Sequence, residues 1–170
     1  MRFGRFAMAF QNRRFRMQIR QDDTTASGVA DLLAHHLREL RGAMAGQSFA
    51  LDAAGLSAAS VTFWTVWDGE TLLGFGALKQ LDAAHGEVKS MRAAPAARGT
   101  GVGRAILQHI IEQARQRGYA RLSLETGTAP LHVPAIALYQ SAGFIPCGAF
   151  ADYEPSPHNQ FFRLDLADGL

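Results

Sequence analysis

A glycine-rich stretch at residues 98–103, Arg-Gly-Thr-Gly-Val-Gly, constrains the fold of this chain more than any other feature. It follows a β-rich run at 87–93 and precedes a segment at 104–117 whose apolar residues recur at helical spacing. Backbone N–H groups at a helix N-terminus lack intrahelical acceptors, and glycine lets a phosphate approach them without an intervening Cβ. We therefore expect an anion site here, flanked by Arg98 and Arg104. A plain turn is the alternative, although one or two glycines would suffice for it.

Three kinds of phosphate-binding glycine loop can be compared with this stretch. The P-loop requires Lys-Ser or Lys-Thr after its last glycine, and neither pair follows here. The dinucleotide fingerprint G-x-G-x-x-G is matched by Gly99 and Gly101, but Arg104 stands at its third glycine. Glu125, at the end of the next predicted strand, would be the ribose-binding acid, so a dinucleotide-binding oxidoreductase stays open. The third kind, R/Q-x-x-G-x-G/A, is matched within residues 98–103 at Arg98, Gly101 and Gly103.

A second motif, Ala-Leu-Tyr-Gln-Ser-Ala-Gly-Phe, lies downstream at residues 137–144. The two motifs, in this order and separated by a helix and a strand, resemble the acetyl-CoA-binding motifs of the GCN5-related N-acetyltransferases (GNAT). The segments 123–127 and 147–159 resemble those of a branch of small bacterial acetyltransferases, the YsnE-like proteins. The resemblance implies a single domain over residues 17–170 with an α+β (α/β three-layer) fold, in which helices cover both faces of a mixed central sheet.

The pattern of the chain agrees with that fold. Three runs at 61–67, 72–81 and 87–93 predict an antiparallel meander, whose first turn is Asp68-Gly69. An apolar stripe that includes His36 predicts a helix from Val29 to about Gly42. Residues 43–60 could hold a short second helix and a loop. The remaining expected elements are strands at 17–20, 120–126, 144–148 and 160–166 and a short helix at 135–142 with Pro134 at its first position.

Residues 1–16 differ in charge from the rest of the chain. They carry five arginines and no acid, and removing them takes the formal net charge from +2 to −3. The basic character therefore belongs to this extension, and no nucleic-acid partner is expected. We expect the extension to be disordered or an addition upstream of a natural start at Met17. A transit-type segment is an alternative, since such segments are rich in Arg and poor in acids.

Two further features bear on location and partners. No apolar run approaches the roughly 18 residues of a membrane span, so no membrane partner is expected. Cys147 is the only cysteine, so an intrachain disulfide framework is impossible, which fits a cytoplasmic protein. The sequence leaves a homodimer open. No metal site is expected, because the adjacent His35 and His36 do not share a helix face and are more often solvated or half-buried.

The resemblance implies acetyl-CoA as co-substrate. Its pyrophosphate would bind the loop residues Arg98, Gly99, Thr100, Gly101, Val102, Gly103 and Arg104. Its pantetheine arm would pair with the backbone of Met91, Arg92 and Ala93, where an N–H could also stabilise the oxyanion. His132 stands where the family often has an asparagine that contacts the same arm. An imidazole could donate a hydrogen bond there or serve as a base.

The resemblance also implies candidates for proton transfer. Tyr139 occupies the family's usual tyrosine position and would protonate the leaving thiolate; the alternative is a buried tyrosine that only packs. Two carboxylates compete as the base: Glu87, at the spacing from Arg98 found in the histone-acetylating branch, and Glu125, on the strand beside the pantetheine-binding strand. An ion pair with Lys89 is the alternative role for Glu87.

The expected reaction is direct transfer of the acetyl group to a primary amine of a small molecule in a ternary complex. Glu125 and Tyr153 are expected near the acceptor. Besides the dinucleotide-binding oxidoreductase, the sequence leaves open a non-catalytic domain that binds acyl-CoA for regulation.

Overall fold

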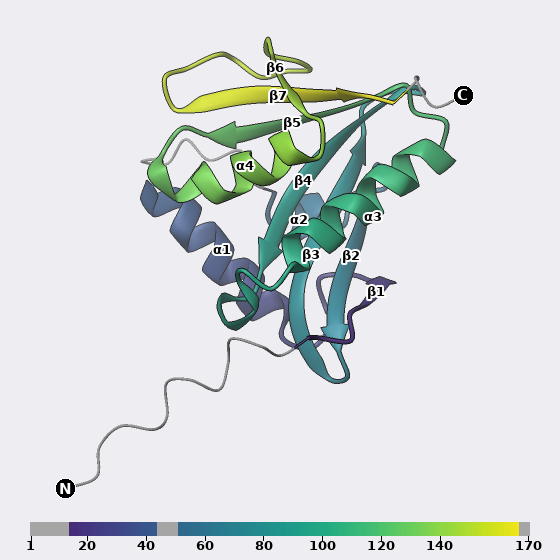
Figure 1. Cartoon of the computed structure of the whole chain (residues 1–170), viewed down its shortest axis with the longest axis vertical. Coiled ribbons are helices and arrows are strands. Elements are labelled where there is room, and N and C mark those ends of the chain that lie inside the picture. The colour runs from purple at the N-terminus through teal and green to yellow at the C-terminus, as the bar shows by residue number, and fades with distance from the viewer. Residues whose placement is uncertain (1–13, 44–50, 167–170) are drawn as a thin grey trace, which may run out of the picture.

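The computed structural model describes residues 14–43 and 51–166 (Figure 1). Of the predicted extension 1–16, only the last three residues fall within this range. Among them, Phe15 packs against the larger hydrophobic core. The short predicted helix between 43 and 60 is confirmed as α2 (Ala53–Leu56). In the described ranges, the helices are too short or too polar to cross a membrane.

A seven-stranded mixed sheet runs through the molecule in the order β1-β2-β3-β4-β5-β7-β6. The pairing of β4 with β5 is parallel and the other pairings are antiparallel, which confirms the predicted meander. This topology differs from the doubly wound parallel sheet of dinucleotide-binding folds. The strands are β1 (Gln18–Gln21), β2 (Val61–Asp68), β3 (Thr71–Gln80), β4 (His85–Ala93), β5 (Arg121–Gly127), β6 (Ile145–Cys147) and β7 (Asn159–Asp165).

Helices cover both faces of the sheet, as predicted. Figure 1 shows α3 (Val102–Gln116) and α4 (Val133–Ser141) on one face and α1 (Val29–Ala43) on the other. The helix α3 begins two residues before the predicted segment 104–117, because Gly101 serves as its N-cap. The helix α4 begins at Val133, so Pro134 is its second residue rather than its first.

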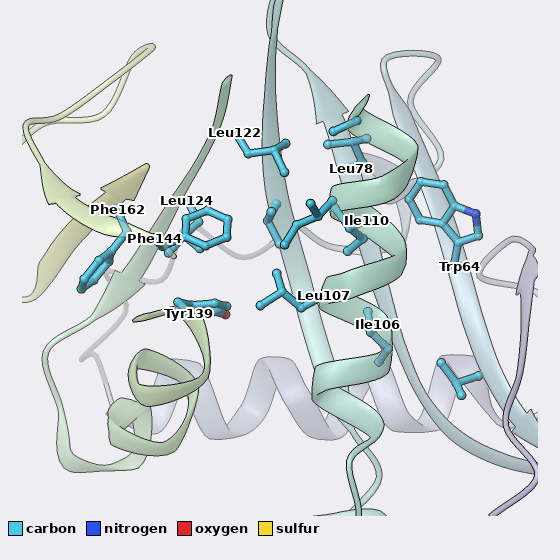
Figure 2. Packing of buried hydrophobic residues seen from close by; sticks show 14 of the residues in the cluster. Trp64, Leu78, Ile106, Leu107, Ile110, Leu122, Leu124, Tyr139, Phe144 and Phe162 are labelled. Carbon is cyan, nitrogen blue, oxygen red and sulfur yellow. The ribbon is translucent and has the colours of Figure 1, made fainter. Parts of the chain in front are cut away.

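Each face of the sheet has its own core. On one face, Ile106, Leu107 and Ile110 of α3 pack against sheet residues that include Leu78 and Leu122 (Figure 2). On the other face, residues of α1 and α2 pack against β2 and β3: Val29, Leu32, Leu33, Leu56, Phe63, Phe75 and Ala77. Because directly paired residues share a face, membership in these cores shows which way their register partners point.

A bulge interrupts β4 at Ser90, whose φ of 52° lies in the left-handed region. In the pairing of β3 with β4, Phe75 faces Arg92 and Ala77 faces Lys89, so one residue of β3 lies opposite two of β4. Lys89 and Arg92 therefore both lie on the α1 face of the sheet. Strand alternation alone would place them on opposite faces, and the sequence pattern gave no sign of the bulge.

The strands β4 and β5 diverge after a short paired region. Their pairing runs from His85–Arg121 to Glu87–Ser123 and ends there. Beyond this point Figure 1 shows the two strands fanning apart. The backbone edge of β4 past Glu87 is therefore not paired with β5, and a ligand can approach it.

Candidate active site

The glycine loop forms the anion-binding geometry expected from the sequence. Gly99 and Gly101 have φ values of 72° and 93°, which glycine adopts without strain, and Gly101 caps α3. The first intrahelical bond runs from Ala105 N–H to the Gly101 carbonyl. Within the described ranges, no acceptor is found for the N–H groups of residues 102–104. The loop therefore presents several unpaired N–H groups at the positive end of a fifteen-residue helix.

The two arginines beside the loop are accessible. Arg104 is exposed. The exposed Arg98 side chain lies 3.4 Å from a carboxylate oxygen of Glu39 on α1. A phosphate at the helix N-terminus would therefore meet two nearby cations, one of which already has a weak carboxylate partner.

A cleft of about 170 Å³ opens where β4 and β5 diverge. Six residues predicted from the sequence line it: Glu87, Met91, Arg92, Glu125, His132 and Tyr139. Ala93 and residues 98–104 do not line it, but they continue β4 directly to the N-terminus of α3. An extended ligand that follows β4 can thus reach both the cleft and the glycine loop.

Glu125 is a poised carboxylate in this cleft. Its Oε1 atom is buried, and no hydrogen-bond partner for it is found in the part of the chain described. Burial raises the pKa of Glu125 to about 7; the Glu87 charge adds to the rise and the Lys89 charge opposes it. A base with a pKa near 7 is available at neutral pH and still binds a proton strongly enough to be useful.

The same raised pKa makes Glu125 costly for stability. The folded state binds the Glu125 proton more tightly than the unfolded state does. The stabilisation of the folded state by this proton is fully present below the ordinary pKa of 4.5 and is lost as the pH rises through about 7. We expect Glu125→Gln to raise the free energy of unfolding by about 1–2 kcal/mol at pH 8 and by much less at pH 4.5. Thermal melts at both pH values would measure this.

The matched control for this stability prediction is Glu70→Gln. Glu70 is exposed in the turn between β2 and β3, so its replacement should leave the pH dependence of the melting temperature unchanged. If Glu125→Gln raised the free energy of unfolding equally at both pH values, burial of the Glu125 carboxylate would not destabilise the folded state.

Glu87 is held in a buried cluster with Lys89 and Tyr153. Its side chain is 2 % exposed and lies 3.2 Å from Lys89 Nζ, so the ion pair considered from the sequence is present. The Tyr153 hydroxyl donates to Glu87 Oε1 at 2.5 Å, and Lys89 Nζ donates to the Tyr153 oxygen at 2.5 Å. Burial and the neighbouring Glu87 charge raise the pKa of Tyr153, which keeps its hydroxyl protonated. Tyr153 thus does not line the cleft itself but contacts two residues that do, Glu87 and Lys89.

Tyr139 lies on α4 and is almost fully buried. Figure 2 shows its side chain among the core residues between α4 and the sheet, and its ring centroid is 6.0 Å from that of Phe144. Burial, with a smaller contribution from the Glu125 charge, raises the pKa of Tyr139 to about 12. The hydroxyl is therefore protonated at every working pH and can serve as a hydrogen-bond donor.

Two buried histidines face the cleft. His132 approaches Gly127 so closely that a Cβ on Gly127 would lie 2.3 Å from His132 Nε2. His36, expected to be solvated or half-buried, is instead 6 % exposed. His36 Nδ1 and His132 Nε2 are buried, and the described residues offer neither a hydrogen-bond partner. Burial lowers the pKa of both imidazoles, that of His36 to about 4, so both are neutral.

Among the cleft-lining residues that sequence reasoning did not assign to the site are His36, Lys89 and Ser90. His36 had a usable signal, because it falls inside the apolar stripe of α1 and therefore faces the sheet. Lys89 also had a signal, because strand alternation places it on the same face as Glu87. Ser90 had none, since a serine in a strand gives no sign of a bulge.

The described residues contain no group of three or more His, Cys, Asp or Glu side chains suited to a metal ion. The arrangement instead combines an anion-binding helix end, a cleft with open strand backbone, a near-neutral carboxylate and a buried hydroxyl donor. An enzyme needs these features to transfer an acyl group from a phosphate-bearing carrier to a nucleophile.

The fold and this site define an acyl-CoA-dependent acyltransferase. The family model described as "Acetyltransferase (GNAT) family" matches residues 29–144, and the chain belongs to this family. It is therefore an acetyl-CoA-dependent N-acyltransferase. The family match therefore argues against the dinucleotide-binding oxidoreductase that the sequence had left open.

Two relatives match most of the chain. The chain is 45% identical over 151 residues to the uncharacterized N-acetyltransferase YsnE of Bacillus subtilis (strain 168), covering 88% of this chain and 100% of the relative. It is 46% identical over 151 residues to the uncharacterized N-acetyltransferase YedL of Escherichia coli (strain K12), covering 88% and 95%. A crystal structure named as an acyl-CoA N-acyltransferase from Klebsiella pneumoniae has a TM-score of 0.72 and 27% identity, covering 89% of this chain and 98% of that one.

Proposed function

We propose that this enzyme transfers the acetyl group of acetyl-CoA directly to a primary amine of a small molecule within a ternary complex. The observation that carries the proposal is the Glu125 carboxylate in the cleft between β4 and β5, which has a pKa of about 7 and a buried oxygen with no partner among the described residues. An ammonium group must lose its proton before its nitrogen can attack a carbonyl, and Glu125 is suited to take that proton.

The residues present fit acetyl-CoA, which would supply the acetyl group as a thioester. The unpaired N–H groups of residues 102–104 would bind the pyrophosphate, with Arg98 and Arg104 beside it. The open backbone of residues 91–93 would pair with the pantetheine arm and supply an oxyanion N–H. His132 Nε2, which has no partner within residues 14–43 and 51–166, can donate a hydrogen bond to the same arm, as the asparagine common at this position in the family would.

Glu125 is a better candidate base than Glu87. Glu87 Oε1 already accepts hydrogen bonds from both Lys89 and Tyr153, so this oxygen is engaged within the protein. For Glu125 Oε1, the described part of the chain contains no donor. We assign Glu87, Lys89 and Tyr153 to the wall of the acceptor site and the proton transfer to Glu125.

Tyr139 acts on the departing sulfur in this mechanism. The amine nitrogen forms a bond to the acetyl carbon, the carbon–sulfur bond breaks, and the sulfur keeps the electron pair. A thiol has a pKa of about 8.5, whereas the pKa of Tyr139 is about 12. Tyr139 therefore stabilises the thiolate by donating a hydrogen bond, and complete proton transfer from its hydroxyl is unfavourable.

Tyr139→Phe is expected to lower kcat about 10- to 100-fold, because a hydrogen bond to a developing charge is lost. The dissociation constant for acetyl-CoA should stay within about twofold. Steady-state rates and calorimetric titration measure the two quantities. Tyr119→Phe, which changes another buried tyrosine of the same core, should alter neither. A kcat that is unchanged in Tyr139→Phe would assign Tyr139 to packing alone.

Direct transfer is proposed because the thiol, the strongest nucleophile that could carry an acetyl group, lies outside the cleft. Cys147, the only cysteine, lies on β6 and does not line it, and burial raises the pKa of its thiol. Initial rates with both substrates varied should therefore give intersecting double-reciprocal lines. Parallel lines would indicate an acetylated enzyme intermediate.

The test of the function is an acceptor screen with acetyl-CoA. Primary amines and alcohols of the same carbon skeleton are incubated with the enzyme, and CoA release is compared with acetylated product by mass spectrometry. The proposal expects equal amounts of CoA and N-acetyl product with amines and no product with the matched alcohols. Acetyl-CoA binding in thermal melts without turnover of any amine would instead support a regulatory acyl-CoA-binding domain.

A further inference from the structure

We infer that the acceptor carries a carboxylate as well as its amine, and that Arg92 and His36 bind this carboxylate. The inference rests on the proposed function, because it extends the acceptor side of the same cleft. It goes beyond that function by naming the second chemical group of the acceptor and the residues that select it.

The two faces of the sheet separate the two substrates. Arg92 pairs with Phe75, which belongs to the core under α1, so Arg92 points to the α1 face. Glu87 pairs with Ser123 and shares this face, as does Glu125 two residues further along β5. Tyr139 and the helix α3 with its glycine loop lie on the opposite face. The acceptor would thus approach from the α1 side of the cleft.

Arg92 has an unused donor in the cleft. Its side chain is 10% exposed, and its Nη2 lies 2.6 Å from Glu39 Oε2. The Nε–H group is buried, and no partner for it is found among the described residues. A guanidinium N–H can only donate, so the missing partner has to be an acceptor such as a carboxylate oxygen. Leaving this group unpaired in a bound complex would be costly.

His36 adds a second donor at the same place. Its ring lies 6.0 Å from the ring of Phe75, the register partner of Arg92, and the Arg92 charge contributes to lowering its pKa. His36 is more than nine-tenths buried, and its Nδ1 has no partner in the described part of the chain. The neutral ring can donate from Nδ1. Ser90 Oγ, a third buried atom without a described partner, comes from the bulge in the same cleft wall.

The charges of the cleft are divided in a way that suits a zwitterion. The Glu125 carboxylate attracts an ammonium group, whereas the Glu87 charge is balanced by Lys89 Nζ at 3.2 Å. Arg92 lies further along β4, and its partner Glu39 is shared with Arg98 and His35 at the rim. The Arg92 charge is thus only partly neutralised from within the protein. A simple alkylamine would satisfy the acidic part and leave the donors of Arg92 and His36 unpaired, whereas an amino carboxylate satisfies both.

The first arm of the test changes the acceptor. Amino acids with free carboxylates are compared with their methyl esters and with the matching amines that lack the carboxyl group, across α-amino acids and acids with the amine several carbons away. We expect kcat/KM to be about 10- to 100-fold higher for the best amino carboxylate than for its ester or plain amine. Equal values would overturn this inference and leave the proposed function intact. Acetylation of no amine at all would instead remove the proposed function.

The second arm changes Arg92. Arg92→Met keeps the length of the side chain and removes its donors, so the preference for the carboxylate over the ester should fall toward one. Arg92→Lys keeps the charge and should retain part of the preference. It is the control that separates loss of the donors from loss of the fold. His35→Gln removes another partner of Glu39, at 3.1 Å, from outside the cleft lining, and should keep the full preference.

The donors of Arg92 and His36 could instead bind the pantetheine arm of acetyl-CoA, and the KM for acetyl-CoA distinguishes this role from carboxylate binding. If the carbonyl oxygens of the pantetheine arm were their partners, Arg92→Met would raise the KM for acetyl-CoA and leave the carboxylate preference unchanged. That result would overturn the inference. A lost preference with an acetyl-CoA KM within about twofold would support it.

Discussion

Glu125→Gln is expected to lower kcat/KM for the acceptor amine about 10²–10³-fold at pH 7.5, because the amide cannot take the proton that the amine must lose. The wild-type enzyme should show a rate that rises with pH through about 7, the pKa to which burial raises Glu125. Below that pH the carboxylate is protonated and inactive. The acidic limb of the pH–rate profile should disappear in the variant, and the measurement is kcat/KM across pH 5 to 9.

Glu87→Gln is the matched comparison for the Glu125 prediction. It removes a carboxylate from the same face of the cleft, but one whose oxygen is already bound by Lys89 and Tyr153. We expect a smaller loss and an acidic limb that remains. If Glu87→Gln removed the limb and Glu125→Gln kept it, the base would be Glu87.

Gly101→Ala should weaken acetyl-CoA and CoA binding about 10- to 100-fold. The φ of 93° at Gly101 is a conformation that alanine adopts only with strain, of about 1–2 kcal/mol. A Cβ at Gly101 would meet no protein atom within 4 Å. It would instead stand where a phosphate must approach the first N–H groups of α3. Calorimetric titration with CoA measures this effect.

Gly118→Ala is the control for Gly101→Ala. Gly118 follows the other end of α3 with a φ of 75°, and a Cβ there also meets nothing within 4 Å. Both variants should therefore lose similar stability in thermal melts, while only Gly101→Ala loses CoA affinity. Equal CoA affinity in the two variants would mean that the glycine loop is a turn and not the pyrophosphate site.

Much of the fold could be predicted because its signals are local. Glycine spacing fixed the place of the loop at residues 98–103, and alternation or helical periodicity located the main strands and helices within a few residues. Family membership was carried by the loop together with residues 137–144. These features depend on short stretches of sequence and on backbone preferences that single residue types impose.

The arrangement inside the cleft could not be predicted to the same degree, because it depends on tertiary structure. The bulge at Ser90 turns Arg92 to the acceptor face, and a serine in a strand gives no sign of a positive φ. The sequence could not rank Glu87 and Glu125, since their difference arises from hydrogen bonds to Lys89 and Tyr153, the latter distant in sequence. His36 lay in a recognisable apolar stripe, but its neighbours across the sheet were unknown.

A crystal structure of the enzyme with acetyl-CoA tests the central claim most directly. The account predicts pyrophosphate oxygens within hydrogen-bond distance of the N–H groups of residues 102–104, and a pantetheine arm that follows β4. It also predicts the acetyl carbonyl in the opening between β4 and β5, with Glu125 facing it directly or through one water. Acetyl-CoA bound away from this opening, or a Glu125 carboxylate turned out of the cleft with Glu87 beside the acetyl group, would contradict the account.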